Sequence, residues 1–326
     1  MSSMKAVRLH EIGGPQNLRV EEIARPVPAP GERLVRVRAA AFNRRDVFIT
    51  QGLYPGIALP RTLGSDGAGI LEESGEEVVI DPMLGWGDDP ALWAPDATIL
   101  GMPHDGTFAE YVAVPMENVY AKPAHLTLEQ AAALPVAGLT ALLTLEVAGF
   151  VLGRRVLVTG ASGGVGRFAV QLAKLAGAHV TAVSRRTEGL KELGADELAH
   201  EIDLHGPTYH AILDAVGGPV LGAALQRVDP GGTVVSFAST VTEPVSYPSR
   251  EFFSRAPRAR LFGFYLFDII DHTRSAGTDL RRLADLVAEK KLDPQVHLTL
   301  PWTEAGEAIR ELLERRVNGK AVLTVD

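Results

Sequence analysis

The stretch that decides the fold of this chain is RRVLVTGASGGVGRFAVQLAKLAGAHVTAVSRR, residues 154–186. An apolar run ending at Thr159 predicts a buried strand, a glycine-rich loop follows it, and apolar residues at helical spacing lead to a second strand that ends at Ser184. A strand, glycine turn, helix and strand in this order place a pyrophosphate at a helix N-terminus, because glycines let the backbone approach the phosphates. We therefore expect a dinucleotide site, the alternative being a glycine turn with a structural role alone. The residues expected to contact the ligand are Gly160, Ala161, Ser162, Gly163, Gly164, Val165 and Gly166.

The end of the second strand indicates which dinucleotide would bind. A carboxylate at this place suits the free ribose hydroxyls of NADH, whereas an arginine accommodates the 2′-phosphate of NADPH. The chain has Ser184, Arg185 and Arg186 here. Two guanidinium groups can hold a phosphate by charge-assisted hydrogen bonds, so the sequence favours NADPH. The alternative is that both arginines belong to a solvated turn.

The chain is long enough for two domains, at 326 residues with 46% hydrophobic residues. Short β-type runs occupy the first part, at Lys5–Leu9, Leu34–Ala40, Gly69–Glu72, Glu77–Ile80 and Phe108–Val114. Helical stretches then alternate with strands at Val156–Thr159, His179–Ser184, Ala211–Asp214, Thr233–Ala238 and Leu261–Leu266, which predicts a parallel sheet. Two helices, Asp279–Lys290 and Thr303–Arg315, precede a last strand at Ala321–Val325 that we expect to rejoin the first domain. The predicted domains are residues 1–122 with 269–326, and residues 123–268.

Composition excludes several classes of protein. Cysteine is absent, which excludes disulfides, thiolate metal sites and a cysteine nucleophile. The net charge of −8, without a block of Lys or Arg, argues against nucleic acid as a partner. No apolar run follows the first residues, so we expect a cytoplasmic location rather than secretion. The apolar stretch Ala131–Leu152 contains Pro135 and Glu146, so we interpret it as buried helices and expect no membrane partner.

Motifs along the whole chain resemble one family. They are NRRD at Asn43–Asp46, GLYP at Gly52–Pro55, LGSDGAG at Leu63–Gly69, GTFAEYV at Gly106–Val112, AALPVAGLTA at Ala132–Ala141, the glycine loop, and NGKAVL at Asn318–Leu323. In this order they are similar to the medium-chain dehydrogenase/reductase superfamily, and most of all to its zinc-independent NADPH:quinone oxidoreductases and enone reductases. The resemblance implies an α/β fold, with a β-rich GroES-like catalytic domain and a Rossmann-type domain whose parallel sheet is doubly wound.

The same resemblance indicates that catalytic zinc has been lost. Zinc-containing relatives bind the metal through a Cys and through the His and Glu of a GHE turn, and this chain has Asn43, Ser65 and Asp66 at the matching positions. One carboxylate cannot form a tight zinc site, so we expect no metal. The segment Pro82–Gly101 matches a four-cysteine lobe but has no cysteine, and we expect Trp86 and Trp93 to fill it or to lie at a pocket mouth. His200, His205 and His210 are spaced by five residues, which is not the spacing of helical metal ligands, and we interpret them as solvated loop residues.

The resemblance further implies a hydride transfer in which Asn43, Tyr54 and Ser65 donate hydrogen bonds to the oxygen of the substrate, although each could be a turn residue alone. The substrate class is a small electrophile, a quinone or an α,β-unsaturated carbonyl. For Asp46, a carboxylate that holds the loop is an equally open interpretation. Relatives often contact the 2′-phosphate through a Tyr that the segment GADELAHEID, residues 194–203, does not contain. The residues implied to bind the cofactor are Asp46, Thr140, Phe237, Ala238, Phe262, Gly263, Phe264, Asn318 and Lys320.

Two further expectations concern the oligomeric state of the protein and the alternative to an enzyme. The apolar, β-prone run Ala259–Phe267 would leave an open edge on the parallel sheet, and in the family this strand pairs with its twin, so we expect a homodimer. The chain's own tail could instead cover this edge. The alternative to an enzyme is a catalytically silent NADPH-binding protein with a sensing or structural role.

Overall fold

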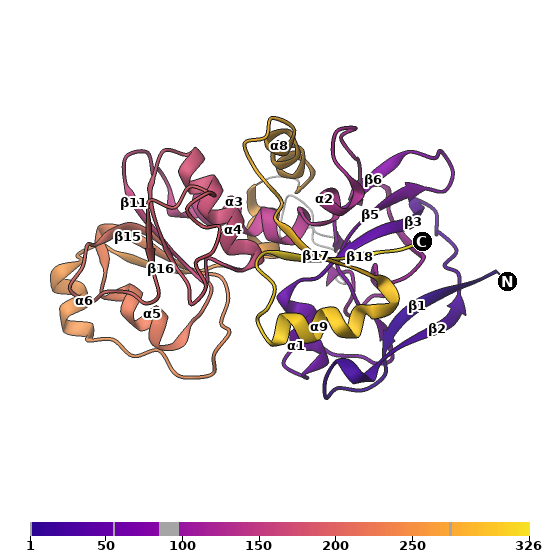
Figure 1. Cartoon of the computed structure of the whole chain (residues 1–326), viewed down its shortest axis with the longest axis horizontal. Coiled ribbons are helices and arrows are strands. Elements are labelled where there is room, and N and C mark those ends of the chain that lie inside the picture. The colour runs from indigo at the N-terminus through magenta and orange to yellow at the C-terminus, as the bar shows by residue number, and fades with distance from the viewer. Residues whose placement is uncertain (1, 55, 85–97, 274–275) are drawn as a thin grey trace. The chain divides into compact units, whose positions relative to one another are not determined.

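The computed structural model describes residues 2–54, 56–84, 98–273 and 276–326. Trp86 and Trp93 lie outside these residues. The chain divides into two compact units, one formed by Met1–Ala137 with Ile270–Asp326 and the other by Gly138–Ile269 (Figure 1). The first boundary therefore lies at residue 137, whereas the sequence placed it at residue 122. The difference arises because helix α2 (Leu128–Ala132) packs against strands β3 (Glu32–Ala41) and β5 (Asp66–Leu71) of the first unit.

The first unit is rich in antiparallel strands, as a GroES-like domain requires. One sheet has the order β2-β1-β4 and a larger one the order β10-β6-β5-β3-β18-β17, with β9 against β3 and a separate pair β7-β8. The last strand β18 pairs antiparallel with β3, which confirms that the end of the chain rejoins the first domain. The remaining strands are β1 (Ser3–Leu9), β2 (Leu18–Ala24), β4 (Arg61–Thr62), β6 (Glu77–Ile80), β7 (Met83–Leu84), β8 (Thr98–Ile99), β9 (Tyr111–Pro115), β10 (Val119–Ala121), β17 (Val296–Pro301) and β18 (Lys320–Thr324).

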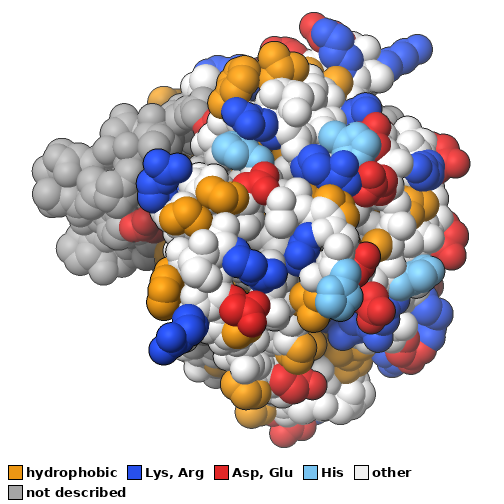
Figure 2. Space-filling model, turned by 90° about the vertical axis from the view of Figure 1, so that its left-hand side faces the viewer, with side chains coloured by type: hydrophobic (Ala, Val, Ile, Leu, Met, Phe, Trp, Pro, Cys, Tyr) orange, Lys and Arg blue, Asp and Glu red, His pale blue; other side chains and the backbone are white. Residues whose placement is uncertain are grey.

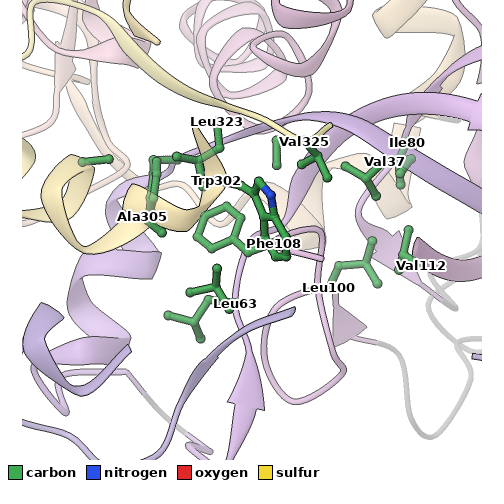
Figure 3. Packing of buried hydrophobic residues seen from close by; sticks show 14 of the residues in the cluster. Val37, Leu63, Ile80, Leu100, Phe108, Val112, Trp302, Ala305, Leu323 and Val325 are labelled. Carbon is green, nitrogen blue, oxygen red and sulfur yellow. The ribbon is translucent and has the colours of Figure 1, made fainter. Parts of the chain in front are cut away.

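Helices cover parts of this unit. They are α1 (Arg44–Thr50), α2, α7 (Leu266–Thr273, which crosses the unit boundary), α8 (Ala276–Ala288), α9 (Ala305–Leu313) and the short 3-10 helices η1 (Pro15–Asn17), η3 (Met116–Asn118) and η4 (Trp302–Glu304). Apolar residues of α1, η4 and α9 join the strands in one core (Figure 3). Phe108 has no exposed surface, and its ring lies 4.5 Å from that of Phe42. Trp302, from the C-terminal part of the chain, is 6% exposed in the same cluster. Burial of these rings anchors the tail to the N-terminal strands.

The second unit is a parallel sheet of the Rossmann type, as predicted. Its strand order is β13-β12-β11-β14-β15-β16, and each neighbouring pair is parallel. Strand β11 lies between β12 and β14, and the strands follow one another in sequence order outward from β11 on both sides. The elements are α3 (Pro135–Ala148, which begins in the first unit), β11 (Arg155–Thr159), α4 (Gly164–Leu175), β12 (His179–Val183), β13 (Glu197–Ala199), β14 (Tyr209–Asp214), α5 (Gly218–Leu225), β15 (Val228–Ser236), α6 (Ser249–Arg255) and β16 (Arg260–Gly263).

One predicted strand is shorter than expected. The run predicted as strand Leu261–Leu266 ends as β16 at Gly263, and α7 begins at Leu266. Leu266, Phe267 and Ile270 are buried on one face, which is the spacing of a helix. The homodimer edge predicted over Ala259–Phe267 is therefore limited to β16, which is the edge strand of its sheet. No strand was predicted at the positions of β2, β4, β7, β8, β10, β13 and β17.

The charges on the surface and the lengths of the helices concern two classes that the sequence argued against, nucleic-acid-binding proteins and membrane proteins. On the face drawn in Figure 2, Lys and Arg side chains lie interspersed with Asp and Glu. Within the described ranges, no helix has the length and apolarity needed to cross a membrane.

Candidate active site

The polar site of the first unit begins at the N-terminus of α1. Asn43 is the residue before this helix, and its extended backbone lets its N–H donate to Asp46 Oδ2 at 2.8 Å. Asp46 has no exposed surface, and burial raises the pKa of its carboxyl group, although Arg45 acts in the opposite direction. This geometry matches the interpretation of Asp46 as a carboxylate that holds the loop. Its Oδ1 is buried and has no hydrogen-bond partner among the described residues.

Lys320 is the cation at the centre of this site. Its ammonium group donates to Phe42 O at 2.7 Å, to Asn43 Oδ1 at 2.8 Å and to Asp66 Oδ2 at 3.3 Å. An ammonium group has three protons, so these three acceptors satisfy it. The Lys320 side chain is 2% exposed and that of Asp66 0%. The sequence placed Lys320 at a cofactor phosphate or ribose. The structure instead directs its protons to oxygens of the first unit, and we assign it to the buried cluster.

Asp66 connects the cluster to two other parts of the unit. Its Oδ1 accepts from Val136 N at 3.2 Å, and its backbone carbonyl accepts from Thr107 Oγ1 at 2.9 Å. Burial raises the pKa of the Asp66 carboxyl, whereas the neighbouring Lys320 and the hydrogen bonds lower it. A buried carboxylate needs such partners to remain charged.

The three predicted donors differ in accessibility. Asn43 and Tyr54 are half-buried, whereas Ser65 has no exposed surface. Ser65 Oγ accepts from Asn43 Nδ2 at 3.1 Å, so its hydroxyl supports Asn43 rather than facing a ligand. Tyr54 is held by Arg45, whose guanidinium lies 4.9 Å from the centre of the Tyr54 ring and whose Nε is 3.4 Å from its hydroxyl. Arg45 was not among the predicted site residues, although its position in NRRD next to Asp46 was a usable signal.

This donor set does not fit zinc. Asn43 Oδ1 and Asp66 Oδ2, at two of the positions where zinc-containing relatives have ligands, both accept from the Lys320 ammonium. A zinc site with three or four protein ligands needs their lone pairs free, and Ser65 would add only a neutral hydroxyl. In the part of the chain that the structure describes, no three His, Cys, Asp or Glu side chains are grouped closely enough to hold a metal ion.

The glycine loop of the second unit has the geometry of a phosphate cradle. Gly160 follows β11 with a φ of +61°, in the left-handed region that favours glycine. A Cβ atom added at Gly166 would lie 2.4 Å from Gly160 O and 2.7 Å from Ala161 Cα, so only glycine fits there. Helix α4 begins at Gly164, and no side chain of the described residues caps its N-terminus. The backbone N–H groups there are free to bind an anion, and the helix dipole favours one. These residues fit a dinucleotide pyrophosphate.

The end of β12 brings further polar groups to the loop. Ser184 Oγ donates to Ser162 Oγ at 2.8 Å, which ties the strand end to the glycine loop. Arg185 is exposed and Arg186 is half-exposed. His200, interpreted from the sequence as a loop residue, follows β13, and its Nδ1 lies 3.2 Å from Ser184 O. The parallel pairing of β13 with β12 places it there, and β13 was not predicted from the sequence.

The other predicted cofactor residues are spread over both units. Phe237 and Ala238 follow β15, while Phe262 and Gly263 end β16, with Phe264 next in the chain. They therefore lie at the carboxyl edge of the parallel sheet, where open α/β sheets bind ligands. Thr140 is 7% exposed on α3. Asn318 belongs to the first unit and precedes β18, and its buried Oδ1 has no hydrogen-bond partner in the described ranges.

A buried carboxylate at the carboxyl edge was also missed. Asp214 ends β14, has no exposed surface, and accepts from Thr159 Oγ1 at 2.7 Å and from Gly217 N at 3.0 Å. Burial raises the pKa of its carboxyl group, and these hydrogen bonds lower it. Asp214 thereby ties the ends of β14 and β11 together next to the glycine loop, which is a structural role.

Comparisons with known proteins agree with this architecture. Residues 29–124 match the family model of the alcohol dehydrogenase GroES-like domain, and residues 177–323 match that of zinc-binding dehydrogenases. The acryloyl-coenzyme A reductase of Metallosphaera sedula is 30% identical over 98% of this chain and 100% of its own. A crystal structure of an NAD-dependent alcohol dehydrogenase has a TM-score of 0.88 at 33% identity, covering 99% of this chain and 100% of that one. The quinone oxidoreductase from Coxiella burnetii has a TM-score of 0.80 at 29% identity over both chains in full.

The chain therefore belongs to the medium-chain dehydrogenase/reductase superfamily. It is an oxidoreductase of that superfamily, whose members use a nicotinamide dinucleotide cofactor. The glycine loop of the second unit fits this cofactor.

Proposed function

We propose that this protein is a zinc-independent, NADPH-dependent reductase that transfers hydride to a quinone or an α,β-unsaturated carbonyl. The observation that carries the proposal is the cluster of Asn43, Ser65, Asp66 and Lys320. Through Asn43 it offers a hydrogen-bond donor in place of a metal, and Lys320 already supplies the positive charge. A relative that reduces an acryloyl thioester, itself an α,β-unsaturated carbonyl, supports the substrate class.

Arg185 and Arg186 support the choice of NADPH. Both follow the strand whose end lies beside the ribose in this type of fold, and no carboxylate stands at the three positions 184–186 to repel a 2′-phosphate. His200 adds an imidazole next to Ser184. An NAD-dependent alcohol dehydrogenase among the structural neighbours gives the competing prediction, which is NAD⁺-dependent oxidation of an alcohol.

In the proposed reaction, a nicotinamide cofactor held by the glycine loop would supply the hydride for the β-carbon of an enone or for a quinone. The electron pair of the attacked double bond moves to the carbonyl oxygen, which becomes an enolate or a quinol oxyanion. Asn43 and Tyr54, the two half-buried donors, would hydrogen-bond this oxygen, because preorganised donors stabilise charge that develops there. A proton from solvent completes the reduction.

The test measures NADPH consumption by the purified protein with a panel of quinones and enones, and in parallel NAD⁺ or NADP⁺ reduction with primary and secondary alcohols. We expect turnover with the first panel only. Turnover with alcohols alone would refute the proposal, and binding of NADPH without turnover would favour the silent sensor or structural protein.

The variant Tyr54→Phe examines the role of the phenol. Quinones accept hydride readily, so the loss of one donor should lower kcat more for a simple enone than for a quinone of similar size. For the enone the expected loss is about tenfold to a hundredfold, with a smaller change in NADPH affinity. Equal, small losses for both substrates would mean that Tyr54 only shapes the pocket.

A further inference from the structure

Lys320 determines which way the side-chain amide of Asn43 faces. An ammonium group only donates hydrogen bonds, so the Asn43 atom at 2.8 Å from Nζ must be the oxygen Oδ1. The nitrogen Nδ2 then lies 3.1 Å from Ser65 Oγ and donates one of its two protons to it. The Asn43 amide also acts on Asp66, because a side-chain hydrogen bond from Asn43 lowers the pKa of that carboxyl group. Asn43 is half-buried, and a substrate oxygen that reaches Nδ2 would compete with Asp66 for one of its protons.

We propose that Lys320 is a positioning residue that fixes Asn43 as a hydrogen-bond donor to the electron-accepting oxygen of the substrate. The proposal rests on the function proposed above. If the amide were reversed, its oxygen would face that oxygen and repel the negative charge developing on it. With Oδ1 held by Lys320, the amide presents only N–H groups, which suit a carbonyl or an enolate oxygen.

The electrostatics of the cluster strengthen this donor. A positive charge at Oδ1 draws electron density away from Nδ2, because linked hydrogen bonds polarise one another in a medium of low dielectric. Lys320 itself cannot reach the substrate, since its side chain is 2% exposed and Phe42 O and Asp66 Oδ2 take its other protons. It therefore acts through Asn43.

The test removes the Lys320 charge without leaving a buried carboxylate unpaired. In Lys320→Met/Asp66→Asn both members of the ion pair become neutral side chains of similar size. The matched control is Lys122→Met/Glu77→Gln, in the same unit. There too a lysine side chain is 2% exposed, lies 2.9 Å from a carboxylate and donates to two backbone carbonyls.

Kinetics give the first result. We expect kcat for an enone to fall about tenfold to a hundredfold in Lys320→Met/Asp66→Asn, while the KM for NADPH stays within about twofold. The control should keep the parent kcat per folded molecule. Lys320→Gln/Asp66→Asn retains a neutral donor to Asn43 Oδ1 and should recover most of the lost kcat. A parent-like kcat in the Lys320→Met/Asp66→Asn variant would overturn the proposal.

Nuclear magnetic resonance gives a result that does not depend on turnover. The chain has only four asparagines, Asn17, Asn43, Asn118 and Asn318, so selective ¹⁵N labelling of Asn yields few side-chain amide signals. Asn43→Asp removes one pair and thereby assigns it. We expect the Asn43 amide protons to exchange with solvent about tenfold faster or more in Lys320→Met/Asp66→Asn than in the parent and the control. Equal exchange rates would contradict an orienting role.

The two readouts separate the positioning role from the proposed function. If the parent consumes no NADPH with any acceptor, the proposed function fails, and amide exchange alone decides whether Lys320 orients Asn43. If Lys320→Met/Asp66→Asn does not fold, Ser65→Ala removes the other anchor of the amide without altering a charge. Faster exchange and a lower enone kcat are expected in that variant, and parent-like values of both would refute the anchored amide.

Discussion

Replacing Arg185 and Arg186 together by alanine should change the cofactor preference. A hydrogen bond from a charged group to a phosphate contributes about 1.5 to 3 kcal/mol. Arg185 is exposed and Arg186 half-exposed, so solvent screens both, and we take the lower value for each. The sum of about 3 kcal/mol corresponds to a loss of NADPH affinity of about a hundredfold. NADH lacks the 2′-phosphate, so its affinity should change by less than about threefold.

Titration of the purified parent and the double variant with NADPH and NADH, followed by cofactor fluorescence or calorimetry, measures both constants. Arg154→Ala is the control, because Arg154 is an exposed arginine of the same unit that precedes β11, at the opposite edge of the sheet. If the double variant binds both cofactors as the parent does, Arg185 and Arg186 do not bind the phosphate. An equal loss for both cofactors would instead indicate a disturbed loop.

Three further predictions concern the loop, the pH dependence of stability and the assembly. Gly166→Ala should abolish cofactor binding in a titration, because its Cβ would lie 2.4 Å from Gly160 O. Burial raises the pKa of Asp81 to about 7, so the folded state holds this proton more tightly than the unfolded chain, and stability falls as pH rises through that value. Asp81→Asn should therefore raise Tm at about pH 8 more than at about pH 5, and an equal change at both would contradict this. Sedimentation should show a homodimer of the 34.8 kDa chain paired through β16, and Leu261→Lys, at a half-exposed edge position, should make it monomeric.

The sequence predicted those strands, helices and loops whose residues form an unbroken local pattern. The glycine loop lies where the spacing of its glycines placed it, between β11 and α4, because close backbone approach leaves no substitute for glycine. The strand predicted at Leu261–Leu266 was too long, because its apolar residues suit a strand as well as the first turn of α7. Short β13 carries almost no pattern, and with it the position of His200 next to Ser184 was missed.

The sequence predicted which residues form the candidate site better than it predicted what each of them does. Asn43, Ser65 and Asp46 were identified through motifs, but their partners are distant in the chain. Lys320 lies 254 residues from Asp66 and 277 from Asn43, and only the antiparallel pairing of β18 with β3 brings them together. Such long-range pairing leaves no periodic trace in the sequence. The motifs likewise did not indicate that Ser65 is buried whereas Tyr54 is half-exposed.

We propose above all that this protein reduces its substrate without a metal. The most direct test of this proposal is to dialyse the protein against a strong chelator, measure zinc by elemental analysis, and record NADPH oxidation with an enone and a quinone on the same sample. The absence of cysteine and the engagement of Asn43 and Asp66 by Lys320 predict far less than one zinc per chain and full turnover. Turnover that disappears with the chelator and returns when zinc is added would contradict the account.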